Sequence, residues 1–320
     1  MAASRSRISV VVCAYNEEAY LSACLHSVLA QSRPPDEVLV VNNASTDGTR
    51  RLAERFDGVD VIDEARRGLV HAREAGRRRA TGDLLVYLDA DSRLPLGWIE
   101  VAERAFARRP GLVGLSGAFR YYDWDPWGRL LVRLYDTAVA PVTHALVHHV
   151  LRIGAVFYGG AFCVRRDALD AIGGFDTTIE FHGEDTNLGR RLTAIGTVKL
   201  SFRCPAHTSA RRFRACGTWS VVRLYVRNFC WEILVHRPCD TRHADIRASP
   251  PPARAGRLCQ STTWLNSFQR PPASIIDPQT WMRRSSPRAS VTVSIGSRDT
   301  LNGPKSEVAP SNSTRRSERR

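Results

Sequence analysis

The chain has 320 residues, and 43% of them are hydrophobic, which is enough to bury one large core or two smaller ones. The net charge of +14 is typical of nucleic-acid-binding proteins, but all except two of the 46 basic residues are arginine. More than half of this charge lies in residues 238–320, so the rest of the chain is only mildly basic. This distribution argues against a nucleic-acid partner.

The location of the protein is predicted from what its sequence lacks. No segment resembles a secretory signal, and none reaches the roughly 18–20 uncharged apolar residues of a membrane span. The eight cysteines do not show the spacing of metal ligands. We therefore expect a reduced, cytoplasmic protein.

From residue 8 to about 120, short apolar runs alternate with amphipathic segments. The runs lack strict alternation of polar and apolar residues, which is typical of strands buried on both faces. This order predicts an α/β fold with a mostly parallel sheet flanked by helices. The predicted strands are 8–13, 37–41, 59–62, 83–88 and 112–115, and the predicted helices are 17–30, 48–56, 69–80 and 95–108.

The second part of the chain is less regular. We expect a helix over 127–150, interrupted at Pro141, and a final helix over 219–235. Either helix could pack on the core or lie in a membrane interface. After Pro238, repeated proline, serine and arginine without periodicity predict a disordered or atypical tail, residues 238–320. The other predicted elements are strands 155–164 and 198–202 and a helix over 184–195.

Two carboxylates, Asp89 and Asp91, follow the predicted strand 83–88. Residues two apart in extended chain point to the same side, so both side chains can approach one cation. Hard oxygen ligands suit Mg²⁺ or Mn²⁺ better than zinc. The alternative is a turn with two solvated aspartates.

Further polar segments accompany this pair in a characteristic order. They are Cys13–Glu17, Asn42–Thr49, Gly68–Arg73, Gly173–Asp176 and Gly183–Leu188. Together with Asp89 and Asp91, they resemble the family 2 glycosyltransferases of the GT-A fold over about residues 7–237. The resemblance implies an inverting, metal-dependent enzyme that uses a nucleotide sugar. It also implies a nucleotide-sugar-binding half, residues 1–120, and an acceptor and catalytic half, residues 121–237.

The resemblance implies a role for each matching residue. The nucleotide would be held by Ala14, Tyr15, Asn16, Glu17 and Asn43. Arg73 would neutralise a phosphate, Asp89 would bind the nucleotide sugar as well as the metal, and Gly160 would let the backbone approach the donor sugar. Aspartate is usual in the family at one or both of the positions of Asn42 and Asn43, so the base stays open among UDP-, GDP- and dTDP-linked donors.

The same resemblance assigns the chemistry to an acidic pair. Asp185 would remove the proton of the acceptor hydroxyl, and Glu184 would orient the acceptor. His207 would be a third metal ligand beside Asp89 and Asp91. Each of these features also has a simpler explanation. Glu184 and Asp185 could be acids favoured by a helix dipole, His207 could be a histidine with ordinary partners in the fold, and Gly159 and Gly160 could form a strand bulge.

The acceptor is open between a saccharide and a lipid-linked molecule. The Gln-x-x-Arg-Trp signature of processive synthases is absent, which argues for a non-processive enzyme of the cell envelope or of glycolipid synthesis. The protein could contact the inner face of the cell membrane peripherally. Alternatives are an inactive or damaged transferase and a basic membrane-binding or nucleic-acid-binding protein without catalysis.

Overall fold

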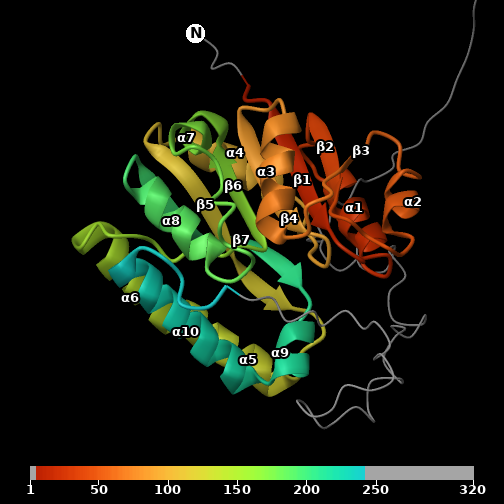
Figure 1. Ribbon diagram of the computed structural model, residues 1–320. Coiled ribbons are helices and arrows are strands. Elements are labelled where there is room, and N and C mark those ends of the chain that lie inside the picture. The colour runs from red at the N-terminus through yellow and green to blue at the C-terminus, as the bar shows by residue number, and fades with distance from the viewer. Residues whose placement is uncertain (1–4, 242–320) are drawn as a thin grey trace, which may run out of the picture. The chain divides into compact units, whose positions relative to one another are not determined.

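A computed structural model describes residues 5–241, which belong to one compact unit (Figure 1). Within these residues, seven strands form a single sheet in the order β3-β2-β1-β4-β6-β5-β7. Only β6 runs antiparallel to its neighbours, so the predicted mostly parallel α/β sheet is confirmed. The predicted tail lies outside the described residues from residue 242 onward. The strands are β1 (Ile8–Ala14), β2 (Glu37–Asn42), β3 (Asp60–Asp63), β4 (Leu84–Asp89), β5 (Leu112–Tyr121), β6 (Ala161–Arg165) and β7 (Thr197–Thr208).

Helices cover both faces of the sheet (Figure 1). Val10 and Val12 of β1 pack with α1, α2 and α4, whereas Val11 and Cys13 pack with α3, α7 and α8. Because both faces are buried, successive residues of β1 are all apolar or small. The helices on the two faces are α1 (Leu21–Leu29), α2 (Thr49–Ala53), α3 (Leu69–Arg79), α4 (Trp98–Ala107), α7 (Arg166–Ala171) and α8 (Glu184–Thr193).

A second group of helices lies beyond the carboxyl ends of β5 and β7 (Figure 1). A continuous helical run over residues 126–150 changes between α-helical and π-helical turns, and the short α9 (Arg211–Cys216) precedes the long α10 (Thr218–Val235). The run consists of α5 (Pro126–Leu134), η1 (Tyr135–Val139), α6 (Ala140–His144) and η2 (Ala145–Val150).

The sheet register brings distant polar residues to one edge. Cys13 of β1 pairs with Asp89 of β4, and Ala14 pairs with Asn42 of β2. The antiparallel β6 pairs with β4, and the Asp89 N–H donates to the Gly160 carbonyl at 3.0 Å. The carboxyl ends of β1, β2 and β4 therefore meet the beginning of β6, where a ligand of an open α/β sheet binds.

Three expectations about the second part were wrong in detail. Pro141 does not interrupt the helix, because the missing N–H falls where π-helical η1 changes to α6. The strand expected over 155–164 begins at Ala161, since residues 155–160 are buried but pair with no strand. The strand expected over 198–202 continues to Thr208 through a bulged pairing with β5. Helices α7 and α9 were not predicted, since six residues are too few for a periodic pattern.

Candidate active site

The centre of the candidate site is Arg73, a residue of α3 that is only 1% exposed. Its guanidinium donates to Glu184 Oε1 at 3.1 Å, to the Gly159 carbonyl at 2.6 Å and to Asp89 Oδ1 at 3.4 Å. The metal-type aspartate of β4 and the acidic pair of α8 therefore share one buried cation. Their sequence separations from Arg73 are 16 and 111 residues.

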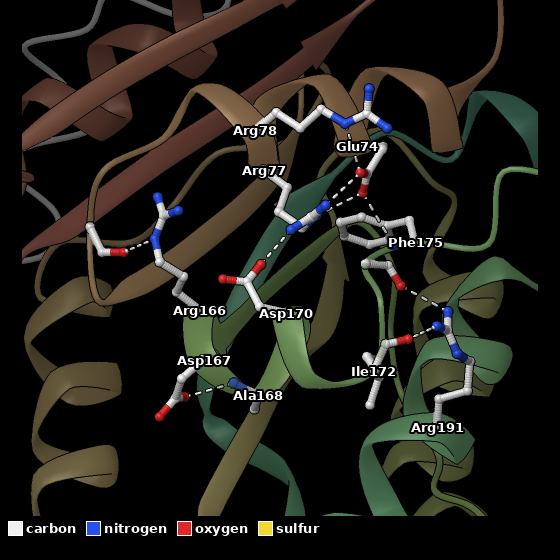
Figure 2. Close-up of polar contacts among 12 residues, drawn as sticks. Glu74, Arg77, Arg78, Arg166, Asp167, Ala168, Asp170, Ile172, Phe175 and Arg191 are labelled. Atoms are coloured by element: carbon white, nitrogen blue, oxygen red, sulfur yellow. Dashed lines mark hydrogen bonds and ion pairs between the residues drawn. The ribbon is translucent and has the colours of Figure 1, made fainter.

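A polar network connects α3, the helix that carries Arg73, to α7 and α8 (Figure 2). Glu74 is buried, accepts from Arg77 Nη2 at 2.7 Å, and accepts the Phe175 N–H at 3.2 Å. Arg77 also pairs with Asp170 of α7, and Arg191 of α8 donates to the Gly174 carbonyl at 2.8 Å. These bonds connect the helix that carries Arg73 to the helix that begins with Glu184. The Gly173–Asp176 segment of the sequence motif lies at this junction.

The acidic pair begins α8 in a site that disfavours charge. Burial raises the pKa of Glu184, the neighbouring Asp185 carboxylate raises it further, and Arg73 opposes both. Burial also raises the pKa of Asp185, against hydrogen bonding by the Thr186 backbone and the charge of Arg73. The pair therefore takes up a proton more readily than ordinary carboxylates do, as a general base must.

A second arginine, Arg211 of α9, neutralises the other aspartate of the β4 end. Its Nε lies 3.0 Å from Asp91 Oδ2, and Nη1 donates to Glu17 Oε2 at 3.0 Å. The guanidinium also lies over the Tyr20 ring, 4.9 Å from the centroid. The sequence did not assign Arg211 a partner, because nothing local distinguishes one arginine among so many.

Gly159 and Gly160 leave the space in which these carboxylates lie. A Cβ at Gly160 would lie 2.8 Å from Phe119 Cζ and 3.2 Å from Asp89 Oδ2. At Gly159 it would lie 3.0 Å from Glu184 Oε1 and 3.1 Å from Asp185 Cβ. The glycine pair thus permits the approach of Asp89 to the acidic pair.

The residues expected to hold the nucleotide line the ends of β1 and β2. Asn16 has a positive φ of 51°, which asparagine tolerates, and its Oδ1 accepts the Thr46 N–H at 2.8 Å. Arg67 lies over the Tyr15 ring at 4.3 Å, and Ala14 is the buried last residue of β1. The expected nucleotide contacts of these residues, and those of Glu17, stay predictions.

Asn43 makes contacts that sequence reasoning did not foresee. Its Nδ2 donates to the carbonyls of Glu64 and Arg66 at 3.1 and 2.7 Å, and its Oδ1 accepts the Gly68 N–H at 2.8 Å. The amide therefore holds the segment that leads into α3. Its expected contact with a base stays a prediction.

The side chains of the site provide only some of the ligands that a divalent cation needs. Asp89 and Asp91 supply hard oxygen atoms, and Mg²⁺-type sites often combine one or two carboxylates with substrate phosphates. Among residues 5–241, no three His, Cys, Asp or Glu side chains gather as ligands for one metal ion. His207 lies within β7, where burial and then the charges of Arg120 and Arg93 lower its pKa. It is therefore neutral at pH 7, as a metal-ligating imidazole is, and its assignment as third ligand stays a prediction.

A cavity of about 710 Å³ lies beside His207, between the ends of β5 and β7 and the helix α5. Its lining combines cationic and apolar side chains, among them Arg120, Arg129, Arg133 and Leu130. It also includes Tyr122, whose hydroxyl donates to the Asp91 carbonyl at 3.1 Å. The cavity is therefore next to the segment that carries the aspartates.

Comparison with known proteins gives related transferases. Glycosyltransferase AglE of Haloferax volcanii is 29% identical over 200 residues, which is 59% of this chain and 62% of that protein. The glucosyl-dolichyl phosphate glucuronosyltransferase of the same organism is 26% identical over 187 residues, 56% of this chain and 58% of that protein. The chain thus spans less than two thirds of the length of these relatives.

Solved structures support the fold. The mannosyltransferase PcManGT from Pyrobaculum calidifontis, solved with GDP-Man and Mn²⁺, matches with a TM-score of 0.55 and 23% identity, over 78% of this chain and 67% of its own. S. aureus TarS 1–349 matches with a TM-score of 0.52 and 17% identity, over 68% and 64%. The family model described as glycosyl transferase family 2 matches residues 9–173, more than half of the chain. The sheet, the acidic edge and this match together show that the chain belongs to glycosyl transferase family 2 and has a GT-A-like fold.

Proposed function

We propose that the protein transfers one sugar from a nucleotide-diphosphate sugar to an acceptor hydroxyl with inversion at the anomeric carbon. The observation that carries the proposal is the position of Arg73 between Asp89 and Glu184. The buried Arg73 guanidinium thereby joins Asp89, which we propose to lie near the donor phosphates, to the acidic pair that contains the proposed base. Family membership supports the class of reaction.

In the proposed reaction, Asp185 accepts the proton of the acceptor hydroxyl. The acceptor oxygen forms a bond to the anomeric carbon while the bond from that carbon to the diphosphate oxygen breaks. The electron pair of the broken bond leaves with the nucleoside diphosphate, and attack from the opposite face inverts the centre. Glu184, held by Arg73 at 3.1 Å, orients the acceptor.

The reaction also requires that the negative charge on the leaving diphosphate is stabilised. Arg211 lies 3.0 Å from the Asp91 carboxylate and is the cation that we assign to the diphosphate. A Mg²⁺ or Mn²⁺ ion held by Asp89 and Asp91, with its remaining ligands from the donor phosphates, would supply Lewis-acid stabilisation of the same charge. The expected neutralisation of a phosphate by Arg73 stays a prediction, and its three protein acceptors fix where its guanidinium would lie.

The base of the donor is proposed to be uracil, guanine or thymine, and the acceptor a saccharide or a lipid-linked molecule. A relative with a dolichyl phosphate in its name supports the lipid-linked alternative. We place the reaction in cell-envelope or glycolipid synthesis at the inner face of the membrane, with transfer of one sugar at a time.

The test is donor turnover by purified full-length protein with a panel of UDP-, GDP- and dTDP-linked sugars and Mn²⁺. Release of nucleoside diphosphate is measured for the wild type, Asp91→Asn and Asp185→Asn. Loss of the base should lower turnover by about 10²–10⁴-fold, and loss of Asp91 should lower it comparably. The control is Asp57→Asn, which changes an exposed aspartate near α2.

Two outcomes would contradict the proposal. Near-normal turnover by Asp185→Asn would remove the assigned base. Absence of turnover by the wild type with every donor, together with salt-dependent binding that survives Asp91→Asn, would favour the binding protein without catalysis.

A further inference from the structure

Two long helices lie against the domain side by side (Figure 1). One is the run over residues 126–150 and the other is α10 (Thr218–Val235). A Cβ placed on Gly154 would meet both Val147 of the first helix and Ile233 of the second. We call residues 126–150 and 218–235 the helix pair.

The first helix is long and apolar enough to cross a membrane, and no other helix among residues 5–241 meets that test. The sequence did not single it out because charged residues interrupt its apolar side chains. Its inner side is bonded to the domain: Tyr158 donates to Asp136 Oδ1 at 2.7 Å, and the Val198 N–H donates to His148 Nε2 at 3.1 Å. These bonds hold the helix along the domain surface.

The outer side of the helix pair is apolar. Only 22% of the most apolar window of the first helix is buried, whereas a core helix would be mostly buried. Eight large side chains each expose more than half of their surface, namely Trp127, Leu134, Val139, Val142, Val150, Trp219, Val226 and Leu234. An apolar surface of this extent on a soluble domain marks an interaction site.

The exposed charges of the helix pair all have one sign. Its two acids are buried: Asp136 binds Tyr158 and Arg120, and Glu232 accepts from Arg190 at 2.8 Å. The exposed charged residues are Arg129, Arg133, Arg223 and Arg227, of which Arg227 also pairs with Asp240. An apolar surface whose exposed charges are arginines is complementary to anionic lipid headgroups.

The arginine-lined cavity adds a second feature. Arg129 and Arg133 belong both to the helix pair and to the cavity wall, where Arg120 and Leu130 join them. A surface that rests against the helix pair would therefore lie at the mouth of a cationic cavity next to His207 and Tyr122.

We propose that the helix pair docks on a membrane surface that contains anionic lipid, with its aromatic and aliphatic side chains at the headgroup boundary and its arginines on lipid phosphates. The helices lie along the membrane and do not cross it. This docking deepens the proposed function and rests on it in one respect, because it would bring a lipid-linked acceptor to the transferase site.

The test is flotation of the full-length protein with two kinds of vesicle, one containing phosphatidylglycerol and one of phosphatidylcholine alone. We expect flotation with the anionic vesicles, weaker binding to the neutral ones, and weakening by salt. The double variant Trp127→Glu/Trp219→Glu should lose at least about 10-fold in vesicle affinity, since both side chains would no longer insert. Arg129→Glu/Arg223→Glu should lose the preference for anionic vesicles. The matched control is Leu96→Glu, which changes an exposed leucine before α4.

Four results would overturn the docking proposal. The first three are no flotation of the wild type with anionic vesicles, unchanged flotation of Trp127→Glu/Trp219→Glu, and a wild-type dimer in solution that the same variant converts to a monomer. Retention on vesicles after an alkaline wash would show a crossing helix and would also overturn it. Nucleoside diphosphate release, measured without vesicles, reports on the proposed function separately: flotation with no release in any donor assay would defeat the transferase and leave the docking intact.

Discussion

Arg211 and Asp91 form an ion pair across 3.0 Å, and the same guanidinium binds the buried Glu17. A divalent cation and the Arg211 guanidinium would both bind the Asp91 carboxylate, so we expect them to compete. We expect Arg211→Gln to raise the Mn²⁺ affinity of the donor-free protein by up to about 5-fold, which corresponds to the roughly 1 kcal/mol that an ion pair can contribute, while it lowers donor turnover. Electron paramagnetic resonance of free Mn²⁺ measures the affinity.

The control for this prediction lies on the same helix. Arg214→Gln removes an exposed arginine that pairs with Asp123 instead. It should leave Mn²⁺ affinity as it is in the wild type. Equal affinities of wild type and Arg211→Gln would show that Arg211 does not compete for Asp91.

Arg73 is expected to stabilise the fold as well as the site. Arg73→Met keeps the length of the side chain but leaves Glu184, Asp89 and the Gly159 carbonyl without their cation. The free energy of unfolding should fall by about 3–5 kcal/mol, as it does when one partner of a buried pair is removed. Urea unfolding followed by circular dichroism measures it. Arg78→Met, on an exposed arginine of the same helix, should cost less than about 1 kcal/mol, and equal losses would contradict the buried role.

The acidic pair predicts an unusual pH dependence. Burial and the neighbouring carboxylate raise the pKa of Glu184, and burial raises that of Asp185. Because the base acts only when ionised, kcat/KM should rise with pH through a value above the ordinary carboxylate range of about 4. Glu184→Gln removes a like charge, so the acid limb should move to lower pH. The control is Glu180→Gln, which changes an exposed glutamate and should leave the acid limb of the pH profile in place. The assignment would be refuted if Glu184→Gln left the acid limb in place and Glu180→Gln moved it.

A substitution of Gly160 tests how much space lies around the Asp89 carboxylate. In Gly160→Ala, the new methyl group would lie 2.8 Å from Phe119 Cζ and 3.2 Å from Asp89 Oδ2. We expect loss of donor turnover and about 1–3 kcal/mol of stability, because the partly buried Phe119 ring must move. Gly111→Ala meets nothing within 4 Å and should leave both quantities close to the wild type. Turnover and thermal unfolding are measured for both, and a fully active Gly160→Ala would show that the site has more room.

Much of the fold was predictable from local patterns. Uninterrupted apolar runs such as 8–13 indicated strands buried on both faces, and β1 does pack on both faces. The helices of this first part were indicated by spacing that repeats with the helical period. Helix α9 and the strand start at Ala161 were not predictable in this way, since a few residues carry no period and pairing depends on the neighbouring strand.

The sequence alone determined which residue types could do chemistry and where β1, β2 and β4 would end. Asp89 and Asp91 follow a buried strand, and the acidic pair begins a helix after Gly183, because strand ends and helix starts are properties of short segments. The tertiary structure alone decided the partners. Arg73 joins Glu184 across 111 residues and Arg211 joins Glu17 across 194, and such contacts depend on the packing of whole elements. In a chain with this many arginines, no local signal separates the two that neutralise the site from those that face solvent.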